Sequence, residues 1–153
     1  MNRKRMVFLM AAVLALSSFS FAQIGIKFRG SSGWCVGDRY DQSFIVTSQE
    51  VMVGQVLSID TITPLRDMSA GIQLMLKTDR EEIKVHLGPT WFVLNQDINL
   101  SVNDKNIEVR GCRTMIDGKP VLMASMLVRK DKMLILRDND GIPYWCAWRP
   151  RFR

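Results

Sequence analysis

The chain has 153 residues, of which 47% are hydrophobic, and carries a formal net charge of +6 at pH 7. This length fits one domain that buries a core without help from metals or disulfides. Three basic residues and no acidic residue fall within residues 1–22, which leaves 18 basic and 15 acidic residues and a charge of +3. Such a modest charge gives little support to nucleic-acid binding.

The first 22 residues have the three parts of a secretory signal peptide. A basic start precedes an apolar run from Met6 to Leu16, and Ser20-Phe21-Ala22 is a small-x-small cleavage site. The apolar run is shorter than the about 20 residues that span a bilayer. We therefore expect cleavage after Ala22, a periplasmic location, and no transmembrane anchor in the cleaved protein.

An irregular N-terminal arm is predicted over residues 23–48, because residues 25–41 are rich in Gly and Ser and have no sustained periodicity. Its aromatic residues Trp34 and Tyr40 indicate that the arm docks on the domain. From residue 49 onward the sequence changes to short β-type runs. A long strand is predicted over residues 51–62, with a bulge or bend at Gly54.

A β-hairpin is predicted next. Residues 72–77 and 82–87 alternate apolar and polar side chains on either side of a polar turn at residues 78–81. This alternation is typical of two paired strands with one buried face. It places His86 on the outward face of the second strand.

A short helical segment is predicted from Pro89 to Asn95, with proline at its start. Further strands are predicted over residues 106–115, 121–128 and 133–136. Three strands, a short helix and the first two of these further strands follow the element order of an OB-fold. The sequence therefore predicts an all-β protein, a small OB-like five-stranded Greek-key barrel with one short helix over residues 49–141. An SH3-like barrel or a small sandwich is the alternative.

The last segment, residues 142–153, combines aromatic and basic side chains. Trp and Arg are the residues that anchor protein interfaces, so this tail is a candidate partner-binding surface. Its candidate residues are Tyr144, Trp145, Trp148, Arg149, Arg151 and Arg153. In the alternative interpretation, Trp145 and Trp148 close the open end of the barrel and the terminal arginines are solvated.

Three cysteines follow the predicted signal peptide: Cys35, Cys112 and Cys146. An oxidising compartment permits one disulfide among them, with three alternative pairings, and three reduced, partly buried thiols are the other possibility. The sequence has no CxxCH motif, which excludes a covalently attached c-type haem. The only histidine, His86, is a candidate metal ligand, but one histidine without a second nearby ligand makes a poor metal site. We expect no cofactor, and the pattern leaves a metal ion open.

No reaction is suggested by the sequence. It has no nucleophile elbow, zinc-protease motif, phosphate-binding loop or dinucleotide fingerprint, so no enzyme is expected. OB-folds that bind single strands present aromatic side chains along a basic groove. The outward positions of the predicted hairpin hold no aromatic residue and include Glu82, which disfavours a nucleic-acid partner.

Three stretches resemble the magnetosome MamS/MamX-type domain family. They are Val-His-Leu-Gly-Pro-Thr-Trp at 85–91, Val-Arg-Gly-Cys-Arg at 109–113, and the stretch 136–149 that begins Leu-Arg-Asp. The resemblance covers about residues 50–149 and implies a small exported OB-like domain, in a family whose members mostly have no established activity. The family pattern usually has small residues where Cys112 and Cys146 stand, and this paired departure implies a Cys112–Cys146 disulfide.

Together these features predict a non-enzymatic, exported OB-like domain that binds or scaffolds a protein or a cell-envelope component. The alternative is a periplasmic metal or redox accessory protein that uses His86 with Cys112, Cys146 or a methionine. The sequence selects no oligomeric state.

Overall fold

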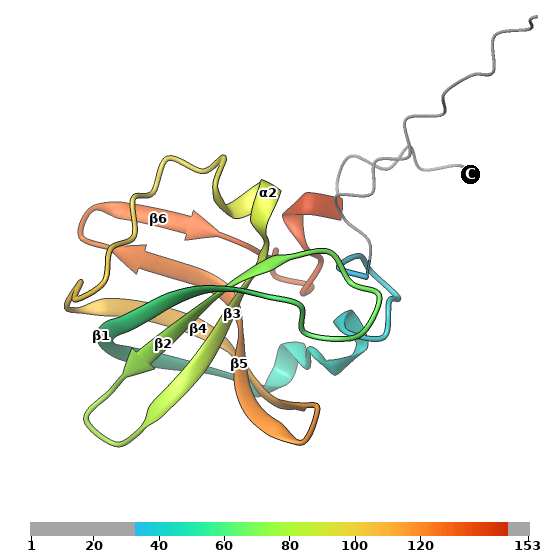
Figure 1. The fold of residues 1–153 in the computed structure, drawn as a ribbon, viewed down its shortest axis with the longest axis horizontal. Coiled ribbons are helices and arrows are strands. Elements are labelled where there is room, and N and C mark those ends of the chain that lie inside the picture. The colour runs from blue at the N-terminus through green and yellow to red at the C-terminus, as the bar shows by residue number, and fades with distance from the viewer. Residues whose placement is uncertain (1–32, 147–153) are drawn as a thin grey trace, which may run out of the picture.

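The structure is a computed structural model that describes residues 33–146 (Figure 1). The predicted signal peptide, the first part of the predicted arm and the last seven residues of the tail lie outside the described residues. Within the part that is described, no helix has the length and apolarity that a membrane span requires.

Six strands form one sheet. They are β1 (Gln49–Ile62), β2 (Gly71–Lys77), β3 (Glu82–Pro89), β4 (Ile107–Ile116), β5 (Lys119–Arg129) and β6 (Lys132–Ile135). The helical elements are short: η2 (Asp41–Ser43), η3 (Val46–Ser48), α2 (Thr90–Val93) and η4 (Tyr144–Cys146).

The sheet closes on itself. Its strand order is β3-β2-β1-β4-β5-β6, and a further parallel pairing between β3 and β5 completes the ring. Strand β1 pairs with two neighbouring strands: with β4 up to Gly54 and with β2 from Gln55 onward. A Cβ atom on Gly54 would lie 2.4 Å from the carbonyl oxygen of Lys77, so the change of partner requires a residue without a side chain.

The predicted fold class is confirmed, because a ring of strands with a short helix between β3 and β4 is the OB arrangement. The predicted hairpin is also present, with β2 and β3 paired antiparallel around residues 78–81. Strand β6 is additional to the five-stranded barrel. Among the described strands it pairs with β5 alone and forms an edge of the sheet.

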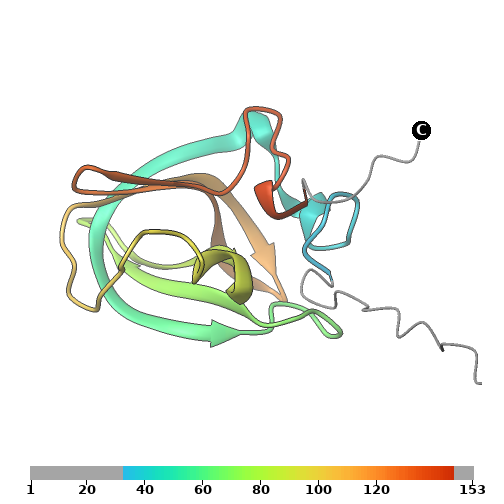
Figure 2. The ribbon, with the colours of Figure 1, turned by 90° about the horizontal axis from the view of Figure 1, so that it is seen from above.

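The core fills the inside of the ring. Inward side chains of successive strands, such as Leu74, Val85 and Leu122, are fully buried, as alternation in a closed barrel requires. Helix α2 lies over one opening of the ring when the molecule is viewed from above (Figure 2). At a cleft elsewhere on the barrel, Arg113 bridges two carboxylates, with Nε 2.9 Å from Glu50 and Nη1 2.9 Å from Glu81.

Candidate functional site

Four outward-facing side chains lie in one row across the barrel. The strand register places Gln73 of β2 beside His86 of β3, His86 beside Met123 of β5, and Met123 beside Cys112 of β4. We call these four residues the outward row. Outward positions of a barrel usually face solvent, yet all four are buried. Another part of the chain must therefore cover this face.

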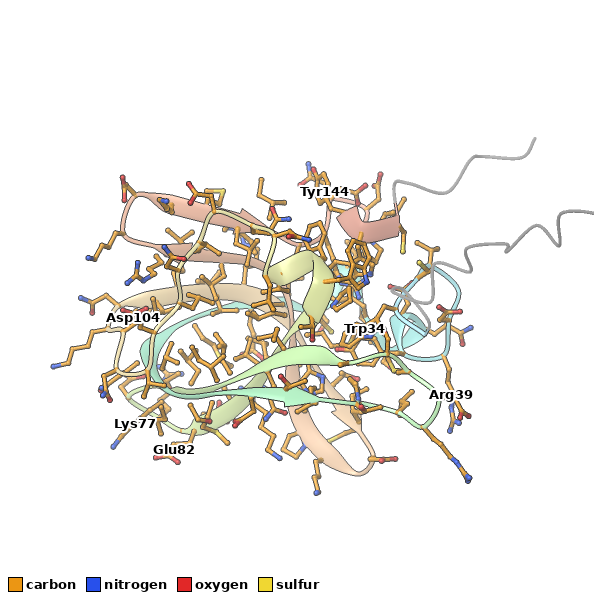
Figure 3. All side chains as sticks on the ribbon, turned by 45° about the horizontal axis from the view of Figure 1, so that its top comes forward. Trp34, Arg39, Lys77, Glu82, Asp104 and Tyr144 are labelled. Atoms are coloured by element: carbon orange, nitrogen blue, oxygen red, sulfur yellow. The ribbon has the colours of Figure 1, made fainter. Side chains whose placement is uncertain are left out.

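The covering segment is the described part of the N-terminal arm, residues 33–48. The Trp34 indole donates a hydrogen bond to the carbonyl oxygen of Ser69 at 2.9 Å, and its ring lies against Gly71 at the start of β2 (Figure 3). Further along, the backbone N–H of Ile45 donates to Cys112 Sγ at 3.4 Å. The prediction that the arm docks through Trp34 and Tyr40 is confirmed, since both side chains are buried.

His86 lies on the predicted outward face of β3, where the arm covers it. Its Nδ1 is 3.0 Å from the Tyr40 hydroxyl oxygen, the two rings stack, and only 5% of the residue is exposed. Burial, with a smaller contribution from Lys84, lowers the pKa of His86 from 6.5 to about 4. The imidazole is therefore neutral at pH 7. Burial also raises the pKa of Tyr40, so the phenol stays protonated.

A C-terminal segment, residues 136–146, packs over the arm in turn. Arg137 Nη1 lies 2.6 Å from Asp41 Oδ1 and donates to the carbonyl oxygen of Gly141 at 2.9 Å. Its guanidinium carbon is 4.4 Å from the centre of the Phe44 ring. We call the contacts between residues 34–44 and 137–146 the clasp. Sequence reasoning missed it, because no local pattern indicates that two charged residues 96 positions apart will pair.

The structure divides the predicted tail site. Trp145 is 4% exposed, its Nε1 donates to the Trp34 carbonyl oxygen at 2.7 Å, and its ring packs against Phe92 near α2. Trp145 is therefore part of the packed interior and offers no surface to a partner. Tyr144 is 46% exposed and lies at the surface beyond α2 (Figure 3). Four candidates, Trp148, Arg149, Arg151 and Arg153, lie outside the described residues.

The expected Cys112–Cys146 disulfide is not formed, and all three cysteines are free thiols. Cys112 lies beneath the arm, where its sulfur accepts the Ile45 hydrogen bond. Cys146 belongs to the clasp instead, and its sulfur lies 3.9 Å from the carbonyl oxygen of Trp34. Cys112 and Cys146 thus contact different parts of the arm, and the sequence alone does not reveal this.

Metal-binding groups do not gather elsewhere in residues 33–146. In that range no three His, Cys, Asp or Glu side chains converge in the way that a metal ion requires. His86 is the nearest candidate, and its described partners are the Tyr40 hydroxyl and the neighbouring members of the outward row. Any metal would therefore need sulfur ligands from that row.

A cleft of about 400 Å³ remains between the arm and the β1–β2 loop. Its charged lining residues are of both signs: Asp38, Arg39, Arg66, Asp67 and Asp117. OB-folds often bind polymers between the loops that join strands 1 and 2 and strands 4 and 5, which here contribute Arg66 and Asp117. Here the only aromatic lining residue is the buried Tyr40, so the cleft has no exposed surface on which a base could stack.

Exposed apolar side chains gather on other elements. Trp91 and Leu94, in and just after α2, are 39% and 70% exposed, and Met133 and Ile135 of β6 are 57% and 45% exposed. Figure 1 shows α2, β6 and the C-terminal segment at the same end of the molecule. We call these four residues together with Tyr144 the α2–β6 surface. It contains the edge strand of the sheet.

The fold and the covered face define an OB-like barrel domain whose usual ligand-binding strands are packed against its own N-terminal arm. A model of the MamS/MamX magnetosome protein family matches residues 48–134. This is more than half of the chain, and the protein belongs to that family. A comparison with curated proteins finds no match. The matched range contains the barrel strands up to residue 134, whereas the C-terminal segment and all but the last residue of the arm lie outside it.

Proposed function

We propose that the protein is a non-enzymatic OB-like binding or scaffold domain that engages a protein partner through the α2–β6 surface. One observation carries this proposal: the free edge strand of the sheet bears two exposed apolar side chains. In β6, Met133 and Ile135 face outward on either side of the buried Leu134. An edge strand with unpaired backbone groups is a site where an extended segment of another protein adds as a further strand.

Other features favour this surface over the expected ones. The strand 2–3 face, which OB-folds often use for ligands, is covered by the arm. Trp145 is buried within the clasp. At the β5–β6 turn Lys132 already pairs with Asp97, and Asp131 lies beside Lys130, so the partner segment that fits best is mainly apolar.

Site-specific photo-crosslinking in the native cell tests this function. A photo-reactive residue at Ile135 is expected to form an adduct with one protein, and the Met133→Lys variant should abolish that adduct. Met115 of β4 is 59% exposed and is apolar, so the same photo-reactive residue at Met115 is the matched control. Adducts of equal yield from both positions, or none from Ile135, would contradict the proposal.

We further infer that this binding occurs in the periplasm after removal of residues 1–22. The basic start, apolar run and small-residue site of the sequence support export. The full chain, expressed in its native host, is expected to yield a periplasmic protein whose mass corresponds to a start at Gln23. A protein that starts at Met1 and stays in the cytoplasmic fraction would refute the inference.

A second candidate function is that of a metal accessory protein, and the outward row favours it. The register places His86, Met123 and Cys112 on neighbouring strands, and imidazole, thioether and thiolate together suit Cu(I). Anaerobic titration with Cu(I) against a competing chelator should give one bound ion, lost in His86→Gln and Cys112→Ser and kept in Cys35→Ser. Equal binding by all four proteins, or none by the natural sequence, would exclude this role.

A further inference from the structure

Two of the three cysteines meet where the arm joins the C-terminal segment. Cys35 directly follows Trp34, whose carbonyl oxygen accepts the 2.7 Å hydrogen bond from Trp145 Nε1. Cys146 directly follows Trp145, and its Sγ lies 3.9 Å from the same carbonyl oxygen. The Cys35 side chain and the backbone of Val36 lie close enough to the Cys146 thiol to shift its pKa. Two cysteines about 110 positions apart in the sequence are thus brought close together.

We propose that Cys35 and Cys146 form an intramolecular disulfide when the protein meets a disulfide oxidant, and that this bond holds the arm over the outward row. The geometry favours closure because both backbones are already held in turns. The Cys35 N–H donates to Asp38 Oδ2 at 2.9 Å, and the Cys146 N–H donates to the Pro143 carbonyl oxygen at 3.0 Å. Bonded sulfur atoms lie about 2.05 Å apart, so closure requires the two neighbouring side chains to rotate toward each other.

Cys112 stays outside this bond. It is fully buried in β4, and its sulfur accepts a hydrogen bond from the Ile45 N–H and donates one to the Arg113 carbonyl oxygen at 3.5 Å. The segment around Ile45 covers it. The chain therefore contains one pair of neighbouring thiols and one isolated buried thiol. The isolated thiol, Cys112, is an internal control for the oxidation.

The reaction is two successive thiol–disulfide exchanges. Cys146, the more exposed thiol of the pair, loses its proton and attacks one sulfur of the oxidant R–S–S–R, which releases one R–SH. Cys35 then loses its proton and attacks the Cys146 sulfur, which forms the Cys35–Cys146 bond and releases the second R–SH. The protein gives up two protons and two electrons, and the oxidant takes up both. Burial raises the pKa of Cys146 to about 12, so the first exchange should accelerate as pH rises.

The bond would link Cys35 and Cys146, which lie near the two ends of the described chain. All six strands would then lie within the closed loop. A cross-link that spans so long a loop restricts the unfolded chain strongly and stabilises the folded state. The same bond would keep Trp34 and Tyr40 in place over β2 and β3. The inference is independent of the proposed binding function, since neither Cys35 nor Cys146 belongs to the α2–β6 surface.

The test uses the purified full chain, first fully reduced and then incubated with oxidised glutathione at pH 8. Free thiols are alkylated in denaturant, and the protein is digested with trypsin. Arginines flank each cysteine in the sequence, so the three cysteines fall on separate peptides. We expect a linked pair of peptides that contain Cys35 and Cys146, alkylation of Cys112 alone, and an intact mass lower by about two hydrogens.

The variants sharpen the result. Cys112→Ser should keep the cross-link, and Cys35→Ser and Cys146→Ser should each lose it. In Cys112→Ser, oxidation should raise Tm by about 5 °C or more relative to the reduced protein. Alkylation of all three cysteines in the natural sequence, or a cross-link that includes Cys112, would overturn the proposal without recourse to any variant.

Discussion

At the scale of single residues, His86 shows how a covering segment changes the chemistry of a side chain. Its position on β3 is outward, and alternation alone would leave it solvated and titrating near pH 6.5. The Tyr40 ring and hydroxyl bury it instead. Because burial disfavours the imidazolium, the pKa of His86 falls to about 4 in the folded protein. The histidine is thus a neutral hydrogen-bonding group of the packed interface.

This lowered pKa predicts a loss of stability in mild acid. Between pH 6.5 and pH 4 the unfolded chain binds a proton at His86 and the folded chain does not, so the free energy of unfolding falls as pH falls. The expected loss attributable to His86 between pH 7 and pH 5 is about 2 kcal/mol. Urea denaturation at both pH values measures it. His86→Gln should lack this component, and an equal pH dependence in the variant would show that other groups cause it.

We expect substitution of Arg137 to lower the free energy of unfolding strongly. Its side chain is 2% exposed, and it pairs with Asp41, contacts Phe44 and donates to Gly141. Arg137→Met leaves the Asp41 carboxylate without its partner in a mostly buried position, with an expected loss of about 3–5 kcal/mol in the free energy of unfolding.

Urea denaturation again provides the measurement for Arg137→Met, and Arg113→Met is the matched control. The Arg113 ion pairs are more than one-third exposed, and exposed pairs contribute little to stability. If both arginine variants lose the same stability, the Asp41–Arg137 pair is not the anchor of the clasp.

At the scale of elements, the arm is held by shape as well as by hydrogen bonds. A Cβ atom on Gly71 would lie 2.2 Å from the Trp34 ring, and one on Gly88 would lie 2.7 Å from the Trp145 ring. Two glycines at the facing ends of β2 and β3 therefore leave the room that two indoles occupy. An indole is rigid, so it cannot yield to a new methyl group as a flexible side chain would.

Gly71→Ala should consequently displace Trp34 and loosen the arm. We expect a loss of about 1–3 kcal/mol in the free energy of unfolding, as is usual for overpacking, and faster amide hydrogen exchange concentrated in residues 33–48. Ala70→Ser, at the exposed neighbouring position, should change neither quantity. Unchanged exchange in the arm of Gly71→Ala would mean that the Trp34 ring does not rest on this glycine.

At the scale of the whole molecule, the protein consists of a family barrel and a covering that lies mostly outside the family match. The match spans residues 48–134, and the arm precedes it. The covering buries the outward row, which includes Cys112 and His86. The barrel without its arm would therefore expose a polar and sulfur-rich strip across β2, β3, β5 and β4.

Deletion of residues 1–47 should make Cys112 reactive. In the longer chain Cys112 is fully buried beneath Ile45, so alkylation of the folded protein should modify it only through rare opening. Without the arm we expect alkylation of Cys112 at least about 100-fold faster, followed by mass spectrometry of its tryptic peptide. Circular dichroism shows whether the shortened barrel is folded. Equal rates in two folded proteins would contradict the covering role of the arm.

The sequence by itself determined the barrel. Alternating apolar residues in 72–77 and 82–87, the polar turn between them and the proline before α2 are local signals, because side-chain alternation and turn geometry depend on neighbouring residues. The aromatic residues Trp34 and Tyr40 also indicated correctly that the arm docks.

Only the tertiary structure decided what the arm covers and which groups meet. The Tyr40–His86 contact, the Asp41–Arg137 pair and the meeting of Cys35 with Cys146 each join residues at least 46 positions apart. No local pattern specifies such pairs, since they depend on the path of a segment without regular periodicity over a closed sheet. The same path buried Trp145 and kept Cys112 apart from Cys146, while the edge strand β6 bears exposed apolar side chains among the described residues.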